Sequence, residues 1–553
     1  MVELDYTGHP LFDVGLAAIV AYTEKAYPTE LTEDDLHKVA GFIEDNYTEQ
    51  PLTSFLTTSL MNSDFTQPAF KDNMARRVDY ARRVAHSFGD DIPKSDEVCV
   101  FTGKPALGVA LSLKRDKEGR EELAQGRAFR QHIPLITSEN IINFSPWGDP
   151  GLPISGEALL CLQFFPMGCR KCAGRLLAVH SDNPDILQVA AKEAWQENVA
   201  AITLARANHE TKLPDASSSA PSLVIETIIK QASKQTRIQQ AHIQRRRRDE
   251  HYSVTAYHLT NSGQSSPLDE KSPPLKIYHL PISSVCFLHI ATTNPEYMTT
   301  WNRLVAYGQQ RLKPAKDKQG KQQEGKDDEM HGVRKGTRNY FYEDIFRLSW
   351  KASEFIRSYF LPVPGLYSVP KNTQSISNNA PSQYSTAVIP GSFIDLFLNA
   401  FLNAPSQYSA AVIPWSFVDL FLQEVMHMEK KRIGAIKELA DRLAAYVDDS
   451  GDKRFFRNFY LVSRGDLFRN ELLRAAKNAA SSGKAPLFTY ESFCTVFFAP
   501  DGDEDLRFDW KLARDLTFVR MLEWLSDHDK ELLDHMSALT EERTSDIPTA
   551  NDE

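Results

Sequence analysis

Cysteine is scarce in this sequence, and so are the signals of exported or membrane proteins. The 553 residues include six cysteines, too few and too dispersed to form a disulfide framework. The first residues lack the basic start and long apolar core of a secretory signal, and neither end carries a lipidation motif. The most apolar early stretch, residues 11–22, is interrupted by Asp13 and is shorter than the roughly 20 residues that cross a bilayer. These absences predict a soluble, cytoplasmic protein with no membrane partner.

A large excess of one charge is absent from most of the chain. The sequence has 63 basic and 73 acidic residues, but residues 501–553 alone contain 16 acidic and six basic groups. The first 500 residues are therefore neutral in sum, so the net charge of −10 does not exclude nucleic-acid binding by them. A content of 42% hydrophobic and 25% charged residues excludes wholesale disorder. At about 100–200 residues per domain, the length predicts two to four domains.

Sequence motifs of the common enzyme classes are also missing. No glycine-rich phosphate loop, His-Glu-x-x-His motif or Gly-x-Ser-x-Gly motif occurs. His528-Asp529 is a pair of the kind that metal-dependent enzymes use, and a nuclease or phosphohydrolase is therefore the alternative function. The triplet His180-Ser-Asp182 contains the residue types of a Ser-His-Asp catalytic triad. Adjacent residues on a strand point to opposite faces, so these three side chains are not expected to form one. We predict a protein that is not an enzyme and has no cofactor.

One cysteine pair has the spacing of a zinc site. Cys169 and Cys172 are two residues apart in sequence, so both thiolates can reach one Zn²⁺. A structural site needs two further ligands, and the remaining candidates, such as Cys99 and Cys161, equally well pack as small hydrophobic groups. We predict a zinc-free core and no metal site.

The spacing of apolar residues predicts an α+β fold in three parts. Residues 10–90 are mostly helical, with a helix start at Thr32-Glu-Asp-Asp35. Residues 97–180 mix short strands with loops, and three later segments alternate as strands do. These segments are Ser253–Leu259, Lys276–Leu280 and Val285–Ile290. We predict a large mixed body with short β-sheets over residues 1–370, a linker over 371–414, and an all-α helical bundle over 415–553.

The predicted linker contains a tandem duplication with a period of 24 residues. Asn379–Leu398 recurs as Asn403–Leu422, with 17 of 20 positions identical. A solenoid needs more copies than this to bury a continuous core. We interpret the repeat as a duplication tolerated at a domain junction.

Basic residues gather in three segments, at 230–248, 303–338 and 453–477. Such clusters neutralise phosphates, and neighbouring aromatic rings stack on unpaired bases, although any single run is commonly a solvated face. Three runs in an otherwise neutral region favour nucleic-acid binding. The predicted contacts to the nucleic-acid backbone are Arg245, Arg246, Arg247, Arg248, Arg334, Lys335, Arg338, Lys453, Arg454, Arg457 and Arg464.

Several short segments, taken in order and spacing, resemble one protein family. They are Asp5–Gly15, Pro51–Phe55 with Asn62–Pro68, Phe129-Arg-Gln-His-Ile-Pro134, and Asn143-Phe-Ser-Pro-Trp-Gly-Asp-Pro-Gly-Leu-Pro153 followed by Lys171–Asp182. The set resembles the Cst-type large subunit of type I-B CRISPR Cascade complexes. The resemblance is dense over residues 1–190 and beyond them rests on domain order and a helical C-terminal part.

The resemblance implies a non-catalytic subunit of a complex guided by CRISPR RNA (crRNA). Its N-terminal body would sit at the crRNA 5′ end and read the protospacer-adjacent motif in double-stranded DNA, and its C-terminal bundle would stabilise the R-loop along the displaced single strand. Implied partners are the Cascade backbone and 5′-end subunits, a helicase-nuclease or transposition proteins, and a small subunit translated from an internal start at Met426. The residues expected to read the motif are Asn62, Ser63, Gln67, Arg127, Arg130, Asn143 and Trp147, whose alternative roles are turn capping and loop packing.

The sequence departs from the family pattern at one place. Family members often carry two Cys-x-x-Cys pairs, at positions matching 99–102 and 155–158. This chain keeps Cys99 but has Thr102, Ser155 and Ala158 at the other three positions. A family zinc site is therefore expected to be lost.

Overall fold

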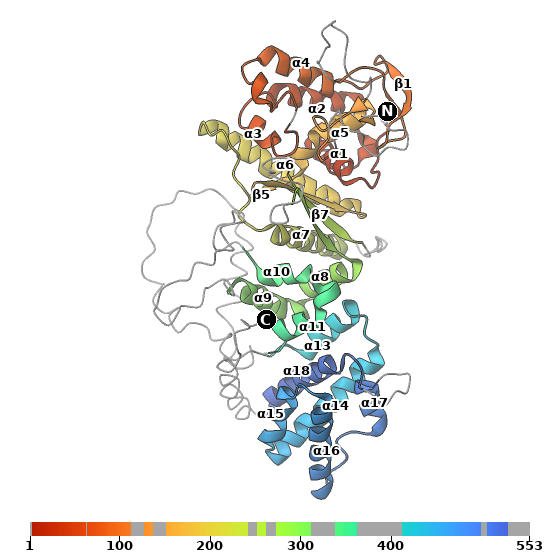
Figure 1. Cartoon of the computed structure of the whole chain (residues 1–553), viewed down its shortest axis with the longest axis vertical. Coiled ribbons are helices and arrows are strands. Elements are labelled where there is room, and N and C mark those ends of the chain that lie inside the picture. The colour runs from red at the N-terminus through yellow and green to blue at the C-terminus, as the bar shows by residue number, and fades with distance from the viewer. Residues whose placement is uncertain are drawn as a thin grey trace, which may run out of the picture. The chain divides into compact units, whose positions relative to one another are not determined.

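The computed structural model describes residues 3–61, 63–111, 127–135, 151–241, 252–260, 273–310, 338–361, 412–498 and 506–528 (Figure 1). The chain divides into two compact units. The N-terminal unit comprises Met1–Pro295 and Gly308–Phe346, and the C-terminal unit comprises Glu296–Tyr307 and Arg347–Glu553. The first unit combines helices with short antiparallel sheets, and the second is built from helices, which confirms the predicted α+β class.

The core of the N-terminal unit forms around α1 (Pro10–Tyr22), a helix that is apolar on nearly every side. Such a helix must be enclosed by other elements. It packs against α5 (Gly156–Phe164), α6 (Pro184–Ala207) and strand β6 (Arg175–Ser181). The other helices before the largest sheet are η1 (Pro28–Glu30), α2 (Glu33–Asn46), α3 (Leu52–Leu56), η2 (Pro68–Phe70), α4 (Met74–Ala85) and η3 (Phe165–Gly168).

The predicted helix start at Thr32 is confirmed. Thr32 Oγ1 accepts the N–H of Asp35 at 3.3 Å, and the Asp35 carboxylate accepts the N–H of Thr32 at 3.1 Å. These reciprocal bonds form a capping box at the start of α2. Leu36, Val39 and Ile43 then follow on the buried face of this helix.

Three antiparallel sheets lie within the described part of the N-terminal unit. The largest has the order β5-β6-β7-β8, with β5 at Arg170–Cys172, β7 at Val254–Leu259 and β8 at Leu275–Leu280. Two of the three predicted strands are thereby confirmed. The smaller sheets pair β1 (Lys94–Val98) with β2 (Pro105–Leu107), and β3 (Arg127–Ala128) with β4 (Leu152–Pro153).

The strand predicted at Val285–Ile290 is wrong. These residues belong to α8 (Ile282–Thr293), which packs against α7 (Ala220–Ala241). The buried positions 284, 287, 288 and 291 follow helical spacing, whereas a short apolar run also satisfies a strand pattern. The remaining helix of the unit is α10 (Tyr340–Ile345).

The C-terminal unit begins earlier in the chain than the predicted boundary at residue 370. Phe355 of α11 (Leu348–Tyr359) stacks on Phe421 of α13 (Trp415–Glu424), with ring centroids 5.3 Å apart, and this aromatic packing draws residues 347–361 into the helical unit. Residues 296–307 of α9 (Pro295–Gln310) join the same unit. The other helices are α14 (Lys430–Ser450), α15 (Lys453–Leu461), α16 (Gly465–Ser481), α17 (Tyr490–Phe497) and α18 (Trp510–His528).

Most of the predicted linker, including the whole first copy of the duplication, lies outside the described residues. The second copy ends inside α13, where Phe417, Val418 and Phe421 are buried. Met426 lies between α13 and α14, so a product started there would contain all of α14 to α18. Every helix among the described residues is too short or too polar to cross a lipid bilayer.

Candidate nucleic-acid interface

Helix α15 separates its phenylalanines from its basic residues. Gly451, in the left-handed conformation with φ 63°, ends α14, and Asp452 caps α15 by accepting the N–H of Phe455 at 2.8 Å. The side chains of Phe455, Phe456 and Phe459 are buried, and those of Lys453, Arg454 and Arg457 are exposed. The sequence spacing therefore directs the basic side chains of α15 to solvent.

Helix α16 continues the basic surface. Its buried face consists of Phe468, Leu472, Ala475 and Ala479. Arg469, Leu473 and Lys477 are all exposed, and their spacing of four residues places them in line along one side of the helix. Leu473, whose exposed fraction is 55%, thus lies between two cations.

The two helices form a hairpin that brings their basic residues together. The rings of Phe459 and Phe468 lie 5.2 Å apart near the connection. At the other end, Arg474 Nη1 lies 3.3 Å from Asp452 Oδ2, directly before the first turn of α15. Lys453 and Arg454 are therefore next to the α16 turn that carries Lys477. We call α15 and α16 together the basic hairpin.

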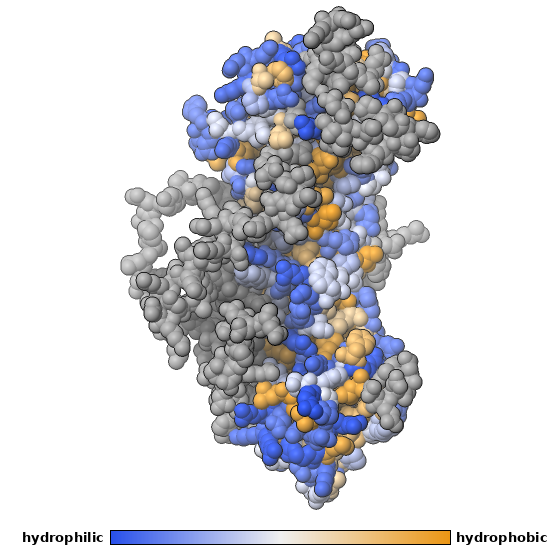
Figure 2. Space-filling model, viewed as in Figure 1, coloured by the Kyte–Doolittle hydropathy of each residue, from blue (hydrophilic) through white to orange (hydrophobic). Residues whose placement is uncertain are grey.

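Four cations of the basic hairpin have no hydrogen-bond or ion-pair partner among the residues that the structure describes. They are Lys453, Arg454, Arg469 and Lys477. Arg464, by contrast, lies 2.7 Å from Asp466, and Arg474 pairs with both Asp452 and Glu471. In Figure 2 the C-terminal unit shows hydrophilic side chains interrupted by separate hydrophobic patches. The unpaired cations are suited to polyanion binding.

Three carboxylates of α18 and its preceding turn are engaged within the unit, while Asp527, near the end of the helix, is exposed. Asp509 accepts two hydrogen bonds from Arg432, at 2.7 and 3.0 Å, and Asp515 accepts one from Arg357 at 2.6 Å. Glu523 accepts a hydrogen bond from Arg520 at 2.6 Å. Residues 506–528 contain four acidic and four basic residues, so the acidic excess of the C-terminal region lies in 501–505 and 529–553.

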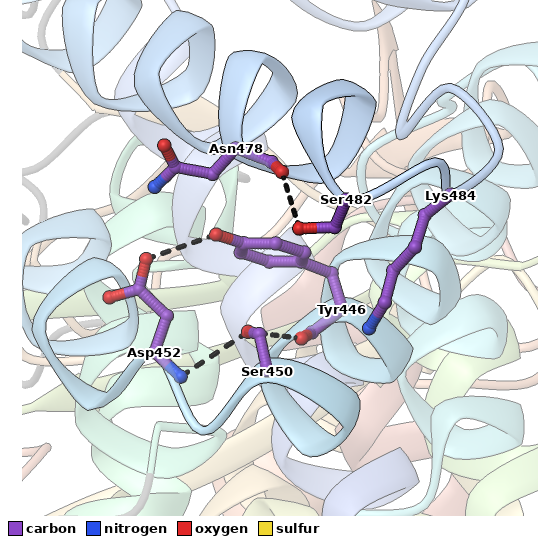
Figure 3. Close-up of a pocket in the computed structure, with 6 residues that line it drawn as sticks. All are labelled: Tyr446, Ser450, Asp452, Asn478, Ser482 and Lys484. Atoms are coloured by element: carbon purple, nitrogen blue, oxygen red, sulfur yellow. Dashed lines mark hydrogen bonds between the residues drawn. The ribbon is translucent and has the colours of Figure 1, made fainter.

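A polar pocket of about 280 Å³ opens where the basic hairpin meets α14 (Figure 3). Its lining groups bind one another: the hydroxyl of Tyr446 donates to Asp452 at 3.0 Å, and that of Ser450 donates to the carbonyl of Tyr446 at 2.6 Å. Lys484, at its rim, lies 3.2 Å from Asp449. Because its polar groups are satisfied internally, the pocket stabilises the hairpin and offers no unpaired cation to an anion.

The structure places two of the expected DNA-reading residues in the interior of the N-terminal unit. Ser63 is fully buried, and its hydroxyl donates to the carbonyl of Leu60 at 2.8 Å. Arg127 is 8% exposed; its Nε donates to Glu97 at 3.0 Å, and its Nη1 donates to the carbonyl of Gly151 at 3.2 Å. Both side chains are engaged in the interior in this conformation, and their contact with DNA bases stays a prediction.

The other predicted residues fall into three groups. Arg130 is exposed and Gln67 is half-buried. The guanidinium of Arg338 is bound by Glu343, at 2.6 and 2.8 Å, and lies over the ring of Tyr340. The predicted residues outside the described part of the chain are Asn62, Asn143, Trp147, Arg245, Arg246, Arg247, Arg248, Arg334 and Lys335.

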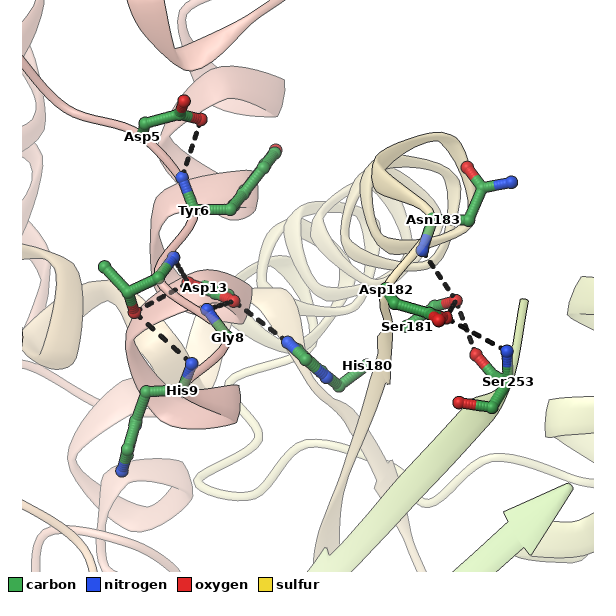
Figure 4. Close-up of polar contacts among 11 residues, drawn as sticks. Asp5, Tyr6, Gly8, His9, Asp13, His180, Ser181, Asp182, Asn183 and Ser253 are labelled. Carbon is green, nitrogen blue, oxygen red and sulfur yellow. Dashed lines mark hydrogen bonds and ion pairs between the residues drawn. The ribbon is translucent and has the colours of Figure 1, made fainter. Parts of the chain in front are cut away.

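A buried hydrogen bond between Asp13 and His180, which the sequence did not predict, orders the N-terminal segment (Figure 4). Asp13 of α1 lies 2.9 Å from Nε2 of His180 at the end of β6, and it also accepts the N–H groups of Thr7 and Gly8 at 2.8 and 2.9 Å. The Nε2 atom of His180 is thus engaged by Asp13, 167 residues away in the sequence. The arrangement fixes residues 7–8 against α1 and β6, within one of the segments that carry the family resemblance.

The positions that match the family's cysteine pairs come together in space. Thr102 Oγ1 and Ser155 Oγ lie 3.4 Å apart, and the N–H of Val100 donates to the carbonyl of Pro153 at 3.2 Å. Ser155 also caps α5 by accepting the N–H of Ala158 at 3.3 Å. Hydroxyl hydrogen bonds are thus formed at two of the positions where the resemblance would place sulfur ligands.

Cys169 and Cys172 are buried thiols that donate to carbonyl oxygens, Cys169 to Phe165 at 3.2 Å and Cys172 to Ser218 at 3.5 Å. Burial raises the pKa of Cys172 to about 12. His528 stacks on the ring of Trp524 and bonds that residue's carbonyl through Nδ1 at 2.7 Å, while Asp529 lies outside the described residues. The described residues contain no cluster of three or more His, Cys, Asp or Glu side chains arranged to hold a metal ion.

Comparison with known proteins gives no match to a family model, a curated protein or a solved structure.

Proposed function

We propose that this chain is the non-catalytic, DNA-recognising large subunit of a crRNA-guided surveillance complex of the type I-B Cascade kind. The observation that carries the proposal is the basic hairpin, with four exposed cations that lack a partner in the described structure. Unpaired cations along helices bind nucleic acid by releasing counterions from its phosphates. In a guided complex, base pairing reads the sequence, and such a surface needs only to hold the displaced strand.

The proximity of Thr102 and Ser155 supports the resemblance on which the rest of the proposal depends. The four ligands of a zinc site must converge in space. A chain that has lost most of these ligands by substitution should still hold the segments around residues 102 and 155 close together, as the contact between Thr102 and Ser155 does. The N-terminal unit would then contact the crRNA 5′ end and the protospacer-adjacent motif, with Arg130 as the described residue exposed for DNA contact. The backbone and 5′-end subunits would bind the same complex in the cytoplasm, and a helicase-nuclease or transposition proteins would act after DNA recognition.

The salt dependence of single-stranded DNA binding tests the basic hairpin. Four phosphate contacts predict a slope of about −2.8 for log K against log salt concentration, or a loss of about 50-fold between 50 and 200 mM salt. Replacing Lys453 and Arg454 by alanine should reduce the slope to about −1.4 and the loss to about sevenfold.

A matched control removes the same charge elsewhere in the unit. Lys437 and Arg442 are exposed on α14, and the side chain of neither has a hydrogen-bond or ion-pair partner among the described residues. K437A/R442A should therefore keep the wild-type slope. An unchanged slope for K453A/R454A, or equal changes in both variants, would show that the basic hairpin does not contact the phosphates.

A further inference from the structure

The basic hairpin has a charge complement within the same chain. Residues 529–553 contain eight acidic and two basic residues, and they follow directly after α18. The described residues of α18 are balanced in charge, with three acidic and three basic residues, so this helix offers no net positive charge to the segment. We infer that residues 529–553 bind the basic hairpin and compete there with nucleic acid. This inference rests on the proposed function, because it describes how the same surface is regulated.

The segment is long enough to reach the hairpin. Phe518 of α18 packs against α15, with its ring 5.0 Å from that of Phe456 and 4.7 Å from that of Tyr460. His528, at the end of α18, is ten residues further on, which is about 15 Å along a helix. The 25 residues after it span up to about 80 Å when extended. The distance back to α15 and α16 is therefore short compared with the reach of the segment.

The exposed surface of α16 matches an acidic segment that also contains apolar residues. Leu473, with an exposed fraction of 55%, lies between Arg469 and Lys477 on the same side of α16. Residues 529–553 include Leu532, Leu533, Met536 and Leu539 among their carboxylates. Burial of leucine against leucine would add to the charge attraction, whereas a phosphate backbone gains little from exposed leucines. The combination of cations with an exposed leucine therefore favours the chain's own segment as the occupant when nucleic acid is absent.

The test keeps the chain at full length and neutralises the segment. Its eight acidic residues are replaced by the matching amides, and binding of single-stranded DNA is measured at low salt. If the segment occupies the hairpin about nine-tenths of the time, neutralisation should tighten DNA binding about tenfold. In a chain that also carries K453A, R454A, R469A and K477A, the same neutralisation should change the affinity by less than about twofold. An equal gain in both backgrounds would identify a long-range charge effect and overturn the inference.

A second measurement separates this inference from the proposed function. A labelled peptide of residues 529–553 is added in trans to the neutralised chain, with the amide-substituted peptide as control. Binding of the acidic peptide alone, lost in the hairpin variant, supports the contact even if the chain binds no DNA, and in that case the proposed function fails by itself. Absence of peptide binding overturns the inference, whatever the DNA measurement shows.

Discussion

Replacing His132 by glutamine tests how the buried histidines link the stability of the N-terminal unit to pH. The ring of His132 is fully buried beside Tyr80, and its Nδ1 accepts the N–H of Phe129 at 3.1 Å. Burial lowers the pKa of His132 to about 3, and burial likewise lowers the pKa of His258 to about 4. Both rings are therefore neutral in the folded protein at pH 5 and above.

The sign of the effect follows from proton binding in the unfolded chain, where a histidine has a pKa of about 6.5. Between pH 6.5 and the folded pKa, the unfolded state binds more protons, so the free energy of unfolding falls as the pH falls. From pH 7 to pH 5 each buried histidine contributes a loss of about 2 kcal/mol, and the two together about 4 kcal/mol. The loss stops growing only below the folded pKa values, near pH 3 to 4.

Hydrogen exchange of the amides of α5 and residues 127–135 measures this change. H132Q, although less stable at pH 7, should lose only about 2 kcal/mol on acidification, so its protection falls about 30-fold less than that of the wild type. H37Q, a matched change at an exposed histidine on α2, should keep the wild-type dependence. If H132Q and the wild type lose protection equally between pH 7 and 5, His132 is not held neutral by burial, and the reasoning is refuted.

Four further substitutions probe features of the fold. R127A should lower the free energy of unfolding of the N-terminal unit by about 2–3 kcal/mol, since it removes charge-assisted hydrogen bonds to Glu97, and urea denaturation should show this. G156A should lower the free energy of unfolding by about 3 kcal/mol, because the added Cβ would clash with the carbonyl oxygen of Ser87. G434A, on α14 with open space around it, should raise the free energy of unfolding by about 1 kcal/mol. Equal shifts in melting temperature for the two variants would contradict this. T32A should cost about 1 kcal/mol through loss of the capping box, and faster hydrogen exchange confined to the first turn of α2 would confirm it.

Local features of the fold could be predicted from the sequence where neighbouring residues determine them. The capping box at Thr32 and the alternation of β7 depend on residues within a few positions, and both were predicted. The strand predicted at Val285–Ile290 failed because a six-residue apolar run fits a buried helix equally well. The early start of the C-terminal unit also escaped prediction, because it depends on aromatic contacts between segments far apart in the chain.

In the candidate site, too, local features could be predicted from the sequence, whereas contacts between distant residues could not. The basic character of 453–477 could be predicted, and so could the local pair of Arg464 with Asp466, but the pair of Arg474 with Asp452 joins residues of two different helical segments and could not. Arg127 carries the charge of a DNA-binding residue, yet Glu97, 30 residues away, binds it in the interior. The pairing of Asp13 with His180 joins residues 167 positions apart, and a single sequence contains no signal for it.

The most direct test of the proposed function is the opening of target DNA by a reconstituted complex. The full chain is combined with crRNA and with type I-B backbone and 5′-end subunits, and 2-aminopurine in the target duplex reports unpairing next to the protospacer-adjacent motif. The proposed function predicts a fluorescence increase that requires this chain, the motif and a matching guide, and that weakens when K453A/R454A replaces the wild type. Equal opening without this chain, or no association of the chain with the crRNA-bound subunits, would contradict it.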